Sequence, residues 1–577
     1  MPKAWRFHPQ RPDVRDVLAR ALGVSPVLAQ LLANRGITEA AEARAFLRPS
    51  LDTLADPFLL PDMDRAVERV QRAIKDKEPI VVHGDYDVDG LTGTALLLNF
   101  FRLVGVEAGF HIPHRVTDGY SLSLGTVERL REKGTKVLIT VDCGTSDIKE
   151  ISFAQRNGID VIVTDHHEPP ATLPEPCALV NPKRPGSRYP HPNICGSAVA
   201  FKLAWALAQG LSNGKKVSEK FRHFLTDALG YVALGTIADV VPLVGENRAL
   251  AAYGLESLRH SKAPGVRAIL AKARVEEGPL TAYHVAFRIA PRLNAGGRVA
   301  DASLGVELLT CDDPARAEEI VETLETANRE RQRIEAEIVE DARAVIDANG
   351  YHRDSVIVVG REGWHGGVVG IVASKLVEAY HRPAIVLSLN DGKSRGSARS
   401  CGGFHLYEAL KHCEDLFESY GGHAQAAGVT MSASKVDDLR ARINAYAAVA
   451  APGADFSDGV MVDTELPLAS ISRTLVDELA MLAPHGAGNP APVFASTQLR
   501  MAGPPRLMGK KGEHMNLNVL QGGVSLRAVG FGMGDRVPEL MQAREGCDAA
   551  YSVELNDWQG RQSIELHLKD IRPTAGA

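Results

Sequence analysis

Three short, apolar, β-branched runs, each followed by a segment of helix length, constrain the fold of this chain more than any other feature. The runs are "PIVVHG" (79–84), "KVLITVD" (136–142) and "DVIVTD" (160–165). After the first run, "LTGTALLLNFFRLVG" is long enough for a helix that ends at Gly105. Strands that alternate with helices predict a parallel sheet with helices on both faces, so we expect an α/β fold.

Acids and histidines follow all three of these strands. The residues are His83, Asp85, Asp87 and Asp89 after the first strand, Asp142 after the second, and Asp165, His166 and His167 after the third. Because ligands of parallel sheets bind beyond the carboxyl ends of the strands, we expect these side chains to meet at one edge. A single aspartate in such a place is commonly a turn residue or a helix N-cap. Acid and imidazole after three successive strands, with few lysines nearby, instead indicate bound cations.

A fourth segment offers Asp239 between the apolar runs "GTIA" and "VVPL". An acid in this setting is costly to bury unless it is paired or ligates a metal, and a helix cap is an equal alternative. The candidate ligands are His83, Asp87, Asp89, Asp142, His166 and Asp239. Four carboxylates balance two divalent cations, the arrangement used for in-line attack on phosphorus. Mixed carboxylate and imidazole ligands favour Mn²⁺, with Mg²⁺ as the alternative.

Length and charge set the outer bounds. A chain of 577 residues predicts three or four domains. The net charge of −6 gives no global basic field, so a nucleic-acid site would need a local basic patch. Seven cysteines, an odd number without a CxxC pair, predict free thiols in a reducing compartment and hence a cytoplasmic protein. With no signal-peptide core and no apolar run of membrane-spanning length, we expect no membrane association.

Several motifs resemble those of a known superfamily. "DYDVDG" (85–90), "TVDCG" (140–144), "TDHH" (164–167) and "GTIADVVPL" (235–243) resemble the four phosphoesterase motifs of the DHH superfamily. Further on, "PRLNAGGR" (291–298), "GSARS" (396–400) and "YGGHAQAAG" (420–428) resemble motifs of the bacterial RecJ family of single-strand exonucleases. The resemblance covers nearly the whole chain, from about "LLANRGI" (31–37) onward.

The resemblance implies roles for individual residues. It makes Asp87, Asp89, Asp142, His166 and Asp239 metal ligands, and His83 aligns with a ligating histidine of some DHH phosphatases. It implies that Asp85 orients the site, and that His167 touches the scissile phosphate or assists proton transfer. The expected substrate-binding residues are Arg115, Arg292, Asn294, Arg298, Ser397, Arg399, Gly422 and His423. Of these, Arg115, Ser397 and Arg399 would form a clamp for a terminal phosphate, because guanidinium forks and hydroxyls bind phosphate well.

Composition and motifs together predict the domain order. We expect an N-terminal helical segment (1–45), a DHH catalytic domain (46–310), a connecting helix (311–350) and a DHH-associated α/β domain (351–454). Short alternating runs from 455 to 577 predict a small β-barrel, an OB-fold in the RecJ family. Its turn-rich loop carries Arg506, Lys510 and Lys511, either as a basic lip that tracks nucleic acid or as a solvated hairpin.

The resemblance implies a metal-dependent exonuclease that degrades single-stranded DNA from its 5′ end, in DNA repair and recombination. Single-strand-binding protein and recombination helicases are the partners expected from the family. One alternative is a DHH phosphodiesterase that acts on short oligonucleotides, cyclic dinucleotides or pyrophosphate, although such an enzyme needs no β-barrel. A second is a non-catalytic DNA-binding scaffold on the same fold, although such a protein should have lost ligands.

Overall fold

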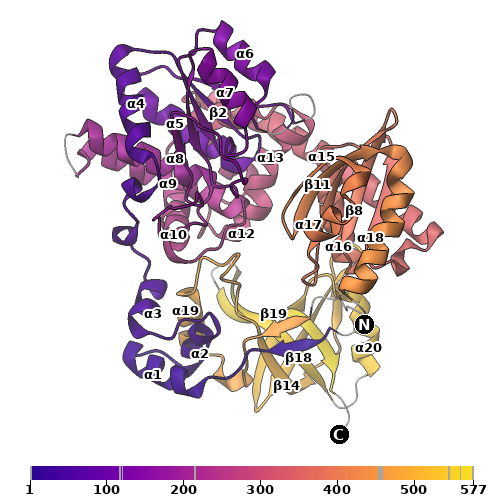
Figure 1. The fold of residues 1–577 in the computed structure, drawn as a ribbon. Helices are drawn as coiled ribbons and strands as arrows, with labels where there is room; N and C mark the ends of the chain where they lie inside the picture. Colours follow the sequence, from indigo (N-terminus) through magenta and orange to yellow (C-terminus); the bar gives the residue numbers. More distant parts are fainter. Residues whose placement is uncertain are drawn as a thin grey trace. The chain divides into compact units, whose positions relative to one another are not determined.

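The computed structural model describes residues 3–115, 119, 121–212, 216–451, 456, 459–542, 546–558 and 561–574. Figure 1 shows the order of the helices and strands along the chain. The chain divides into two compact units, one made of Met1–Ser50 with Ser457–Ala577 and the other of Leu51–Phe456. None of the described helices combines the length and the apolar character that crossing a membrane requires.

The unit 51–456 begins with a five-stranded parallel sheet in the order β3-β2-β4-β5-β6. The strands are β2 (Ile80–Gly84), β3 (Gly109–His111), β4 (Val137–Val141), β5 (Asp160–Thr164) and β6 (Ala178–Val180). The helices on one face include α4 (Met63–Asp76), α5 (Val88–Leu103), α8 (Gly196–Leu211) and α9 (Glu219–Ala238). On the other face lie α6 (Leu124–Glu132) and α7 (Ile148–Arg156). The predicted parallel sheet with helices on both faces is confirmed.

Alternate side chains of the strands supply the two cores of this domain. In β4, Ile139 packs with the α5 and α8 side, whereas Leu138 packs with α6 and α7. This two-sided burial explains why the strands read as continuous apolar runs, with no alternation of polar residues. The predicted helix after β2 begins earlier than expected, at Val88, because Asp87 caps it through its side chain.

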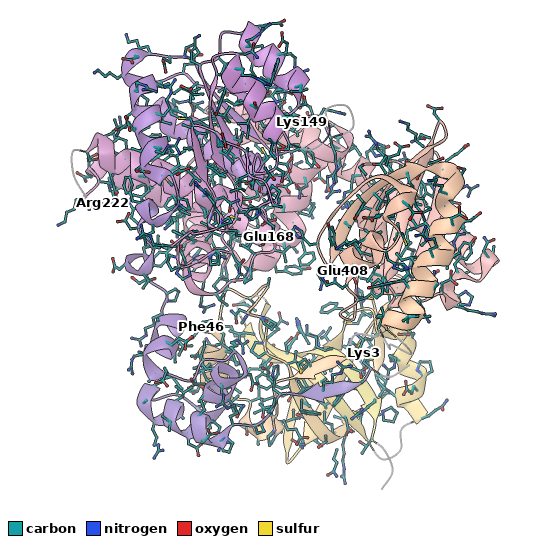
Figure 2. All side chains as sticks on the ribbon, in the orientation of Figure 1. Lys3, Phe46, Lys149, Glu168, Arg222 and Glu408 are labelled. Atoms are coloured by element: carbon teal, nitrogen blue, oxygen red, sulfur yellow. The ribbon has the colours of Figure 1, made fainter. Side chains whose placement is uncertain are left out.

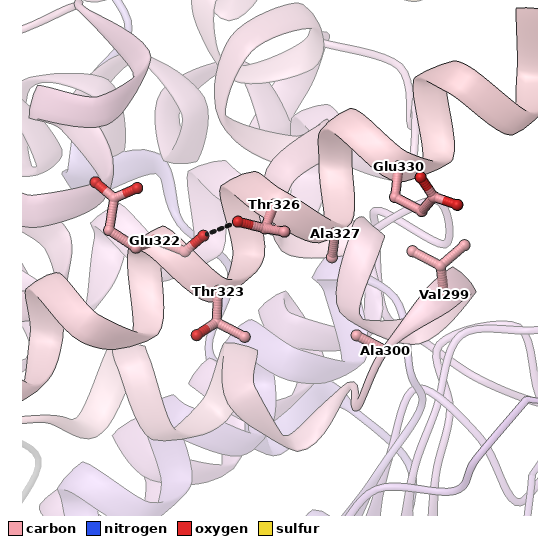
Figure 3. A pocket seen from close by; sticks show the side chains of 7 residues that line it. All are labelled: Val299, Ala300, Glu322, Thr323, Thr326, Ala327 and Glu330. Carbon is pink, nitrogen blue, oxygen red and sulfur yellow. Dashed lines mark hydrogen bonds between the residues drawn. The ribbon is translucent and has the colours of Figure 1, made fainter.

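A long helix leads to the second α/β domain. Helix α15 (Pro314–Asn349) begins after the cap Asp313 and ends at Gly350, whose φ of 71° is in the left-handed region. It is the long helix expected to join the two α/β domains. The end of helix α13 (Ala290–Val299) packs beside α15, and Figure 3 shows the hollow between them, with Val299 and Ala300 facing Thr326 and Ala327.

The second domain is a five-stranded mixed sheet in the order β10-β11-β9-β8-β7. Its strands are β7 (Ile357–Glu362), β8 (Ala384–Asn390), β9 (Lys393–Arg399), β10 (Phe417–Gly422) and β11 (Ala426–Ser432). Helix α16 (Val369–Tyr380) follows a glycine-rich loop after β7 and packs on β8 and β9. The segment "GKSRGSARS" is mostly the strand β9, so its alternate side chains point to opposite faces of the sheet.

The other unit is built on a closed barrel. Its strands are β14 (Phe494–Met501), β16 (His514–Gln521), β17 (Val524–Gly530), β18 (Cys547–Trp558) and β19 (Arg561–Pro573). They pair in the cycle β14-β18-β19-β17-β16, and β16 returns to β14. Closure by five strands, with β15 (Arg506–Met508) added to β16, confirms the predicted OB-fold.

The N-terminal residues belong to the barrel unit. Strand β1 (Trp5–Phe7) pairs in parallel with β12 (Val460–Val462). Helices α1 (Pro12–Leu22) and α2 (Pro26–Asn34) bury Leu18 and Leu28 in the same apolar core as Phe494. This fixes residues 1–50 to the barrel although about 400 residues separate them in sequence. The predicted domain boundary at 454/455 lies outside the described residues.

Candidate active site

The acid-rich loop between β2 and α5 is a tight turn. The Oδ1 of Asp87 accepts hydrogen bonds from the backbone N–H groups of Asp89 (2.9 Å) and Gly90 (3.4 Å). A Cβ at Gly90 would lie 2.5 Å from backbone atoms of Asp85, so only glycine fits there. Asp87 is therefore the N-cap that the sequence offered as an alternative, and the same geometry brings Asp85 and Asp87 into one cluster with Asp142.

Asp89 is held by the first turn of α8. Its two carboxylate oxygens accept hydrogen bonds from the backbone N–H of Ser197 (2.8 Å) and of Gly196 (2.5 Å). A Cβ at Gly196 would lie 2.5 Å from the Cβ of Asp142, which shows how closely the helix start approaches both acids. Gly196 and Ser197 were missed by the sequence analysis. The sequence feature that could have indicated them is "CGSA" (195–198), where small residues begin an apolar helix of 16 residues.

Asp142 comes directly after β4 and adopts a φ of 63°, in the left-handed region. Asp and Asn tolerate this conformation better than other non-glycine residues. Asp239 caps the C-terminal end of α9. The acid at the end of an apolar helix is thus both a helix cap and a member of the site, because its carboxylate reaches the Nε2 of His166 at 3.6 Å.

Asp165 organises the histidine pair. Its Oδ1 lies 2.7 Å from the backbone N of His166 and 2.7 Å from the Nδ1 of His167, and its Oδ2 accepts from the N–H of Thr145 at 2.9 Å. Although burial acts in the opposite direction, the hydrogen bond with His167 lowers the pKa of Asp165. The same bond overcomes burial at His167 and raises its pKa to about 9. The sequence places Asp165 among the acids at the strand ends and indicates no separate role for it.

His166 lies at the centre of the acids. Its Nε2 is 3.0 Å from the Oδ1 of Asp142, 3.6 Å from the Oδ2 of Asp239 and 3.8 Å from the Oδ2 of Asp89. Among the described residues, three overlapping groups have ligand atoms close enough to share a cation. They are Asp85, Asp87 and Asp142; Asp89, His166 and Asp239; and Asp142, His166 and His167.

The electrostatics of this cluster fit bound cations. Burial, together with repulsion from the neighbouring carboxylates, raises the pKa of Asp85, of Asp87 and of Asp142, and raises that of Asp239 to about 8. Burial also lowers the pKa of His166 to about 4, which keeps its imidazole neutral. Within the described part of the chain, the buried Oδ1 of Asp85 and Nε2 of His166 form no hydrogen bond, although the Oδ1 of Asp142 lies 3.0 Å from that nitrogen. Divalent cations would satisfy these atoms and remove the repulsion.

His83 occupies a different position from the other expected ligands. Its Nδ1 lies 3.0 Å from the Nδ1 of His111, and the two rings stack with centroids 5.1 Å apart. It belongs to none of the three groups found among the described residues. Its role as a metal ligand stays a prediction. Asp85, expected only to orient the site, and His167, expected to touch substrate, do belong to such groups.

Three arginines from separate segments approach one another beside the acids. The guanidinium of Arg115 lies over the ring of Tyr86, 4.7 Å from its centroid, and its charge acts on Asp85. Burial and then the charge of Arg115 lower the pKa of Arg399 and lower that of Arg298 to about 10. The glycine-rich loop after β7 contacts this cluster, since the backbone carbonyl of Gly367 accepts a hydrogen bond from Arg298 at 3.1 Å. Residues 116–118 and 120, which follow Arg115 in the sequence, lie outside the described residues.

Two of the remaining expected substrate residues make contacts inside the protein, and three lie on or between the strands beside Arg399. Asn294 accepts a hydrogen bond from the N–H of Val88 (3.1 Å), and Arg292 forms an ion pair with Glu325 (2.7 Å). Both of these contacts support the acid-rich loop or helix α13 from within the protein. Ser397 accepts from Arg399 at 2.9 Å. Gly422 and the exposed His423 lie where β10 turns into β11, and β11 pairs with β9 beside Arg399.

The basic residues of the barrel unit lie on its surface. Arg506, Lys510 and Lys511 are exposed, on β15 and in the turn that follows it.

Figure 2 draws the side chains of the described residues and labels Glu168. This residue follows His167 directly and so marks the carboxyl edge of the parallel sheet that carries the acids.

Comparison with known proteins places the chain in a family. Three family models match, namely the DHH family N-terminal domain over residues 79–236, the DHHA1 domain over 353–449 and the RecJ OB domain over 462–570. The single-stranded-DNA-specific exonuclease RecJ of Bacillus subtilis is 36% identical over 569 residues, which cover 98% of this chain and 70% of the relative. The protein of the same name from Dickeya dadantii is 35% identical, with 98% of both chains covered.

A solved structure agrees with this similarity over the whole fold. The crystal structure of RecJ in complex with Mn²⁺ from Thermus thermophilus superposes with a TM-score of 0.83 at 32% identity, covering 99% of this chain and 80% of that one. Sequence, domain content and fold agree from end to end, and the chain therefore belongs to the RecJ family of DHH proteins.

Proposed function

We propose that this protein hydrolyses the phosphodiester bonds of single-stranded DNA with two divalent cations, removing nucleotides from the 5′ end. The observation that carries the proposal is the convergence of five aspartates and two histidines from four segments into overlapping cation-binding groups. The relatives named as single-stranded-DNA-specific exonucleases match nearly the full chain. Solved RecJ structures contain Mn²⁺ or Mg²⁺, and the mixed ligand set here favours Mn²⁺.

The residues of the site would have two roles, binding the cations and donating a proton. Asp85, Asp87 and Asp142 would hold one cation, and Asp89, His166 and Asp239 the other. When bound, two such cations lower the pKa of a water molecule and polarise a phosphodiester. In the cation-free protein, the hydrogen bond with Asp165 outweighs burial and raises the pKa of His167 to about 9. Its imidazolium would therefore donate to a phosphate oxygen beside the cations or hand its proton to the leaving oxygen.

The arginine cluster would bind the terminal phosphate. Arg115, Arg298 and Arg399 repel one another when no anion is present, because the charge of Arg115 adds to the effect of burial in lowering the pKa of Arg298 and of Arg399. A phosphate dianion would relieve that repulsion and accept bidentate hydrogen bonds. Ser397, Gly422 and His423 lie on the strands next to Arg399 and would complete the pocket.

The OB barrel would guide the strand. Arg506, Lys510 and Lys511 offer exposed cations that follow a nucleic-acid backbone without regard to sequence. We propose further that the protein acts in the cytoplasm, in DNA repair and recombination, and meets single-strand-binding protein and recombination helicases there.

One experiment tests the proposal directly. Single-stranded DNA labelled at either end is incubated with the protein in Mn²⁺, in Mg²⁺ or in chelator, beside duplex DNA and a dinucleotide. We expect metal-dependent shortening of the single strand from its 5′ end. Cleavage of the dinucleotide alone would instead support a short-oligonucleotide phosphodiesterase, and binding without cleavage would support a DNA-binding scaffold.

A further inference from the structure

Two aromatic rings lie side by side on the surface of the catalytic unit. Tyr283 is 61% exposed and Phe287 is 67% exposed. Their ring centroids are 4.8 Å apart with planes tilted by 35°, and the ring of His284 stands edge-on to Tyr283 at 6.1 Å. Exposing two large rings together costs free energy, and paired exposed rings on a folded surface commonly mark a binding site.

The aromatic pair is fixed rigidly to the active site. The short helix α12 (Ala282–His284), the π-helical turn η3 (Val285–Ile289) and α13 follow one another without a break. Val285 and Ile289 are fully buried and anchor this turn in the core. Seven residues after Phe287, Asn294 holds the acid-rich loop through the N–H of Val88. A rise of 1.5 Å per residue places Phe287 roughly 10 Å along the helix axis from that contact.

A second element links the pair to the metal-binding groups. The turn η3 packs against α9, the helix whose last turn leads to Asp239. The aromatic pair is thus supported by two of the elements that position the acids. A π-helical turn at this point is unusual, since such turns are rare and are frequently found at functional sites.

The charges around the pair select the class of ligand. Arg288, beside Phe287, is exposed, and its guanidinium donates to the backbone carbonyl of Arg274 at 3.3 Å. Arg292, one turn further on, is paired with Glu325. The nearest acids in sequence, Glu276 and Glu277, lie in the turn after α11 (Pro264–Ala273), where Glu276 pairs with Arg267. Open ring faces beside a cation suit a ligand that is both planar and anionic, as a nucleotide is.

We infer that Tyr283 and Phe287 form a stacking platform for a base of the single strand, a short distance along the strand from the scissile phosphate. The inference rests on the proposed function and deepens it. The platform holds the strand by its bases while the arginine cluster holds phosphate, and it acts on any sequence because every base offers a π-face. The platform should strengthen binding only of strands long enough to reach both the aromatic pair and the active site, so it should not affect binding of a dinucleotide.

The test pairs a protein variant with a DNA variant. Binding of a twelve-nucleotide strand is measured by fluorescence anisotropy in chelator, for the intact strand and for a series with one abasic nucleotide at successive positions. We expect Phe287→Ala to weaken binding of the intact strand by roughly five- to a hundredfold, the range of one base–aromatic stack. At one abasic position the same substitution should have no further effect, whereas Phe287→Trp should bind every strand like the parent protein.

The controls separate this inference from the proposed function. Phe58→Ala removes another exposed aromatic ring (44% exposed) from the same unit and should leave binding unchanged. Tyr283→Ala should reproduce the pattern of Phe287→Ala if the rings act together, and both should cleave a dinucleotide at the parent rate. Equal losses at all abasic positions, or parent-like binding by both variants, would overturn the platform while leaving the nuclease intact. Failure of the unsubstituted protein to bind or cleave single strands would overturn both.

Discussion

The Nδ1 of His167 lies 2.7 Å from the Oδ1 of Asp165, and the same oxygen accepts from the backbone N–H of His166. One carboxylate therefore stabilises the charged form of one histidine and holds the backbone of the other. Because a ligand held by an outer hydrogen bond is better oriented, loss of that bond commonly costs ten- to a hundredfold in metal affinity or activity.

We expect Asp165→Asn to keep the fold but to reduce cleavage by roughly ten- to a hundredfold. The amide cannot stabilise the imidazolium of His167, so the pKa of His167 should fall toward its ordinary value. Mn²⁺ titrations of activity, with the pKa of His167 followed by NMR, check this. Asp160→Asn, at the other end of β5, is the matched control, and parent-like activity in Asp165→Asn would contradict the assigned role.

The second prediction concerns Asp142, which belongs to two of the cation-binding groups. Asp142→Asn is the informative change, because asparagine tolerates the φ of 63° that alanine would find strained. We expect cleavage to be abolished while binding of single-stranded DNA stays within a few-fold of the parent. Gel assays for cleavage and anisotropy for binding check the two halves. Substantial cleavage by the variant would argue against the two-cation site.

The third prediction concerns Arg115. If it binds a terminal phosphate with Arg399, Arg115→Ala should slow cleavage of 5′-phosphorylated DNA selectively. Loss of one charge-assisted hydrogen bond, about 1.5–3 kcal/mol, predicts a drop of roughly ten- to a hundredfold relative to 5′-hydroxyl DNA. Arg131→Ala, an exposed arginine paired with Glu128, serves as the control. Equal losses on both substrates would mean that Arg115 supports the fold or contacts an internal phosphate.

Sequence patterns predicted the carboxyl edge of the sheet well, and physical reasons explain what they left out. Strand ends in a parallel sheet meet at one edge, so the acids after β2, β4 and β5 could be brought together from their order alone. The N–H groups of Gly196 and Ser197 that hold Asp89 could not be predicted from the sequence. The first turn of α8 lies at the site only because α8 packs on α5. The same holds for the Arg292–Glu325 pair, which links α13 to α15.

The N-terminal helices show the same limit on a larger scale. A helical segment was expected there, but nothing in residues 1–45 indicated that it packs against a barrel that begins more than 400 residues later. The contact between the buried leucines of these helices and the barrel core is visible only in the folded structure. The finding changes how the barrel should be removed, since cutting only residues 455–577 would strip these helices of their core.

The fourth prediction uses that division of the chain. A fragment of residues 51–456 keeps the apolar cores of both α/β domains and should fold. We expect it to cleave a dinucleotide in Mn²⁺ at a rate within a few-fold of the full chain but to bind long single strands much more weakly. Anisotropy with strands of increasing length measures the difference. Equal binding of long strands by fragment and full chain would show that the barrel is not a platform for DNA.

The fifth prediction concerns pH and metal together. Without cations, the pKa of Asp239 is raised to about 8 and that of His167 to about 9. Both groups bind more protons in the folded than in the unfolded state above pH 6.5, so the free energy of unfolding should fall as the pH rises from 6.5 to 8. His166, whose pKa is lowered to about 4, acts the other way, but its effect lies mainly between pH 4 and 6.5, the ordinary pKa of a histidine. Metal-free protein should therefore be less stable at pH 8 than at pH 6.5.

Cations should reverse this trend, because they bind the deprotonated carboxylates and stabilise the folded state more as protons leave. Urea unfolding at pH 6.5 and 8.0, in chelator and in Mn²⁺, measures the four values. We expect the stabilisation by Mn²⁺ to be larger at pH 8.0, and the pH dependence in chelator to shrink in Asp239→Asn, which removes one of the titrating groups. A metal effect that is equal at both pH values, or larger at pH 6.5, would mean that cation binding does not displace protons from this cluster.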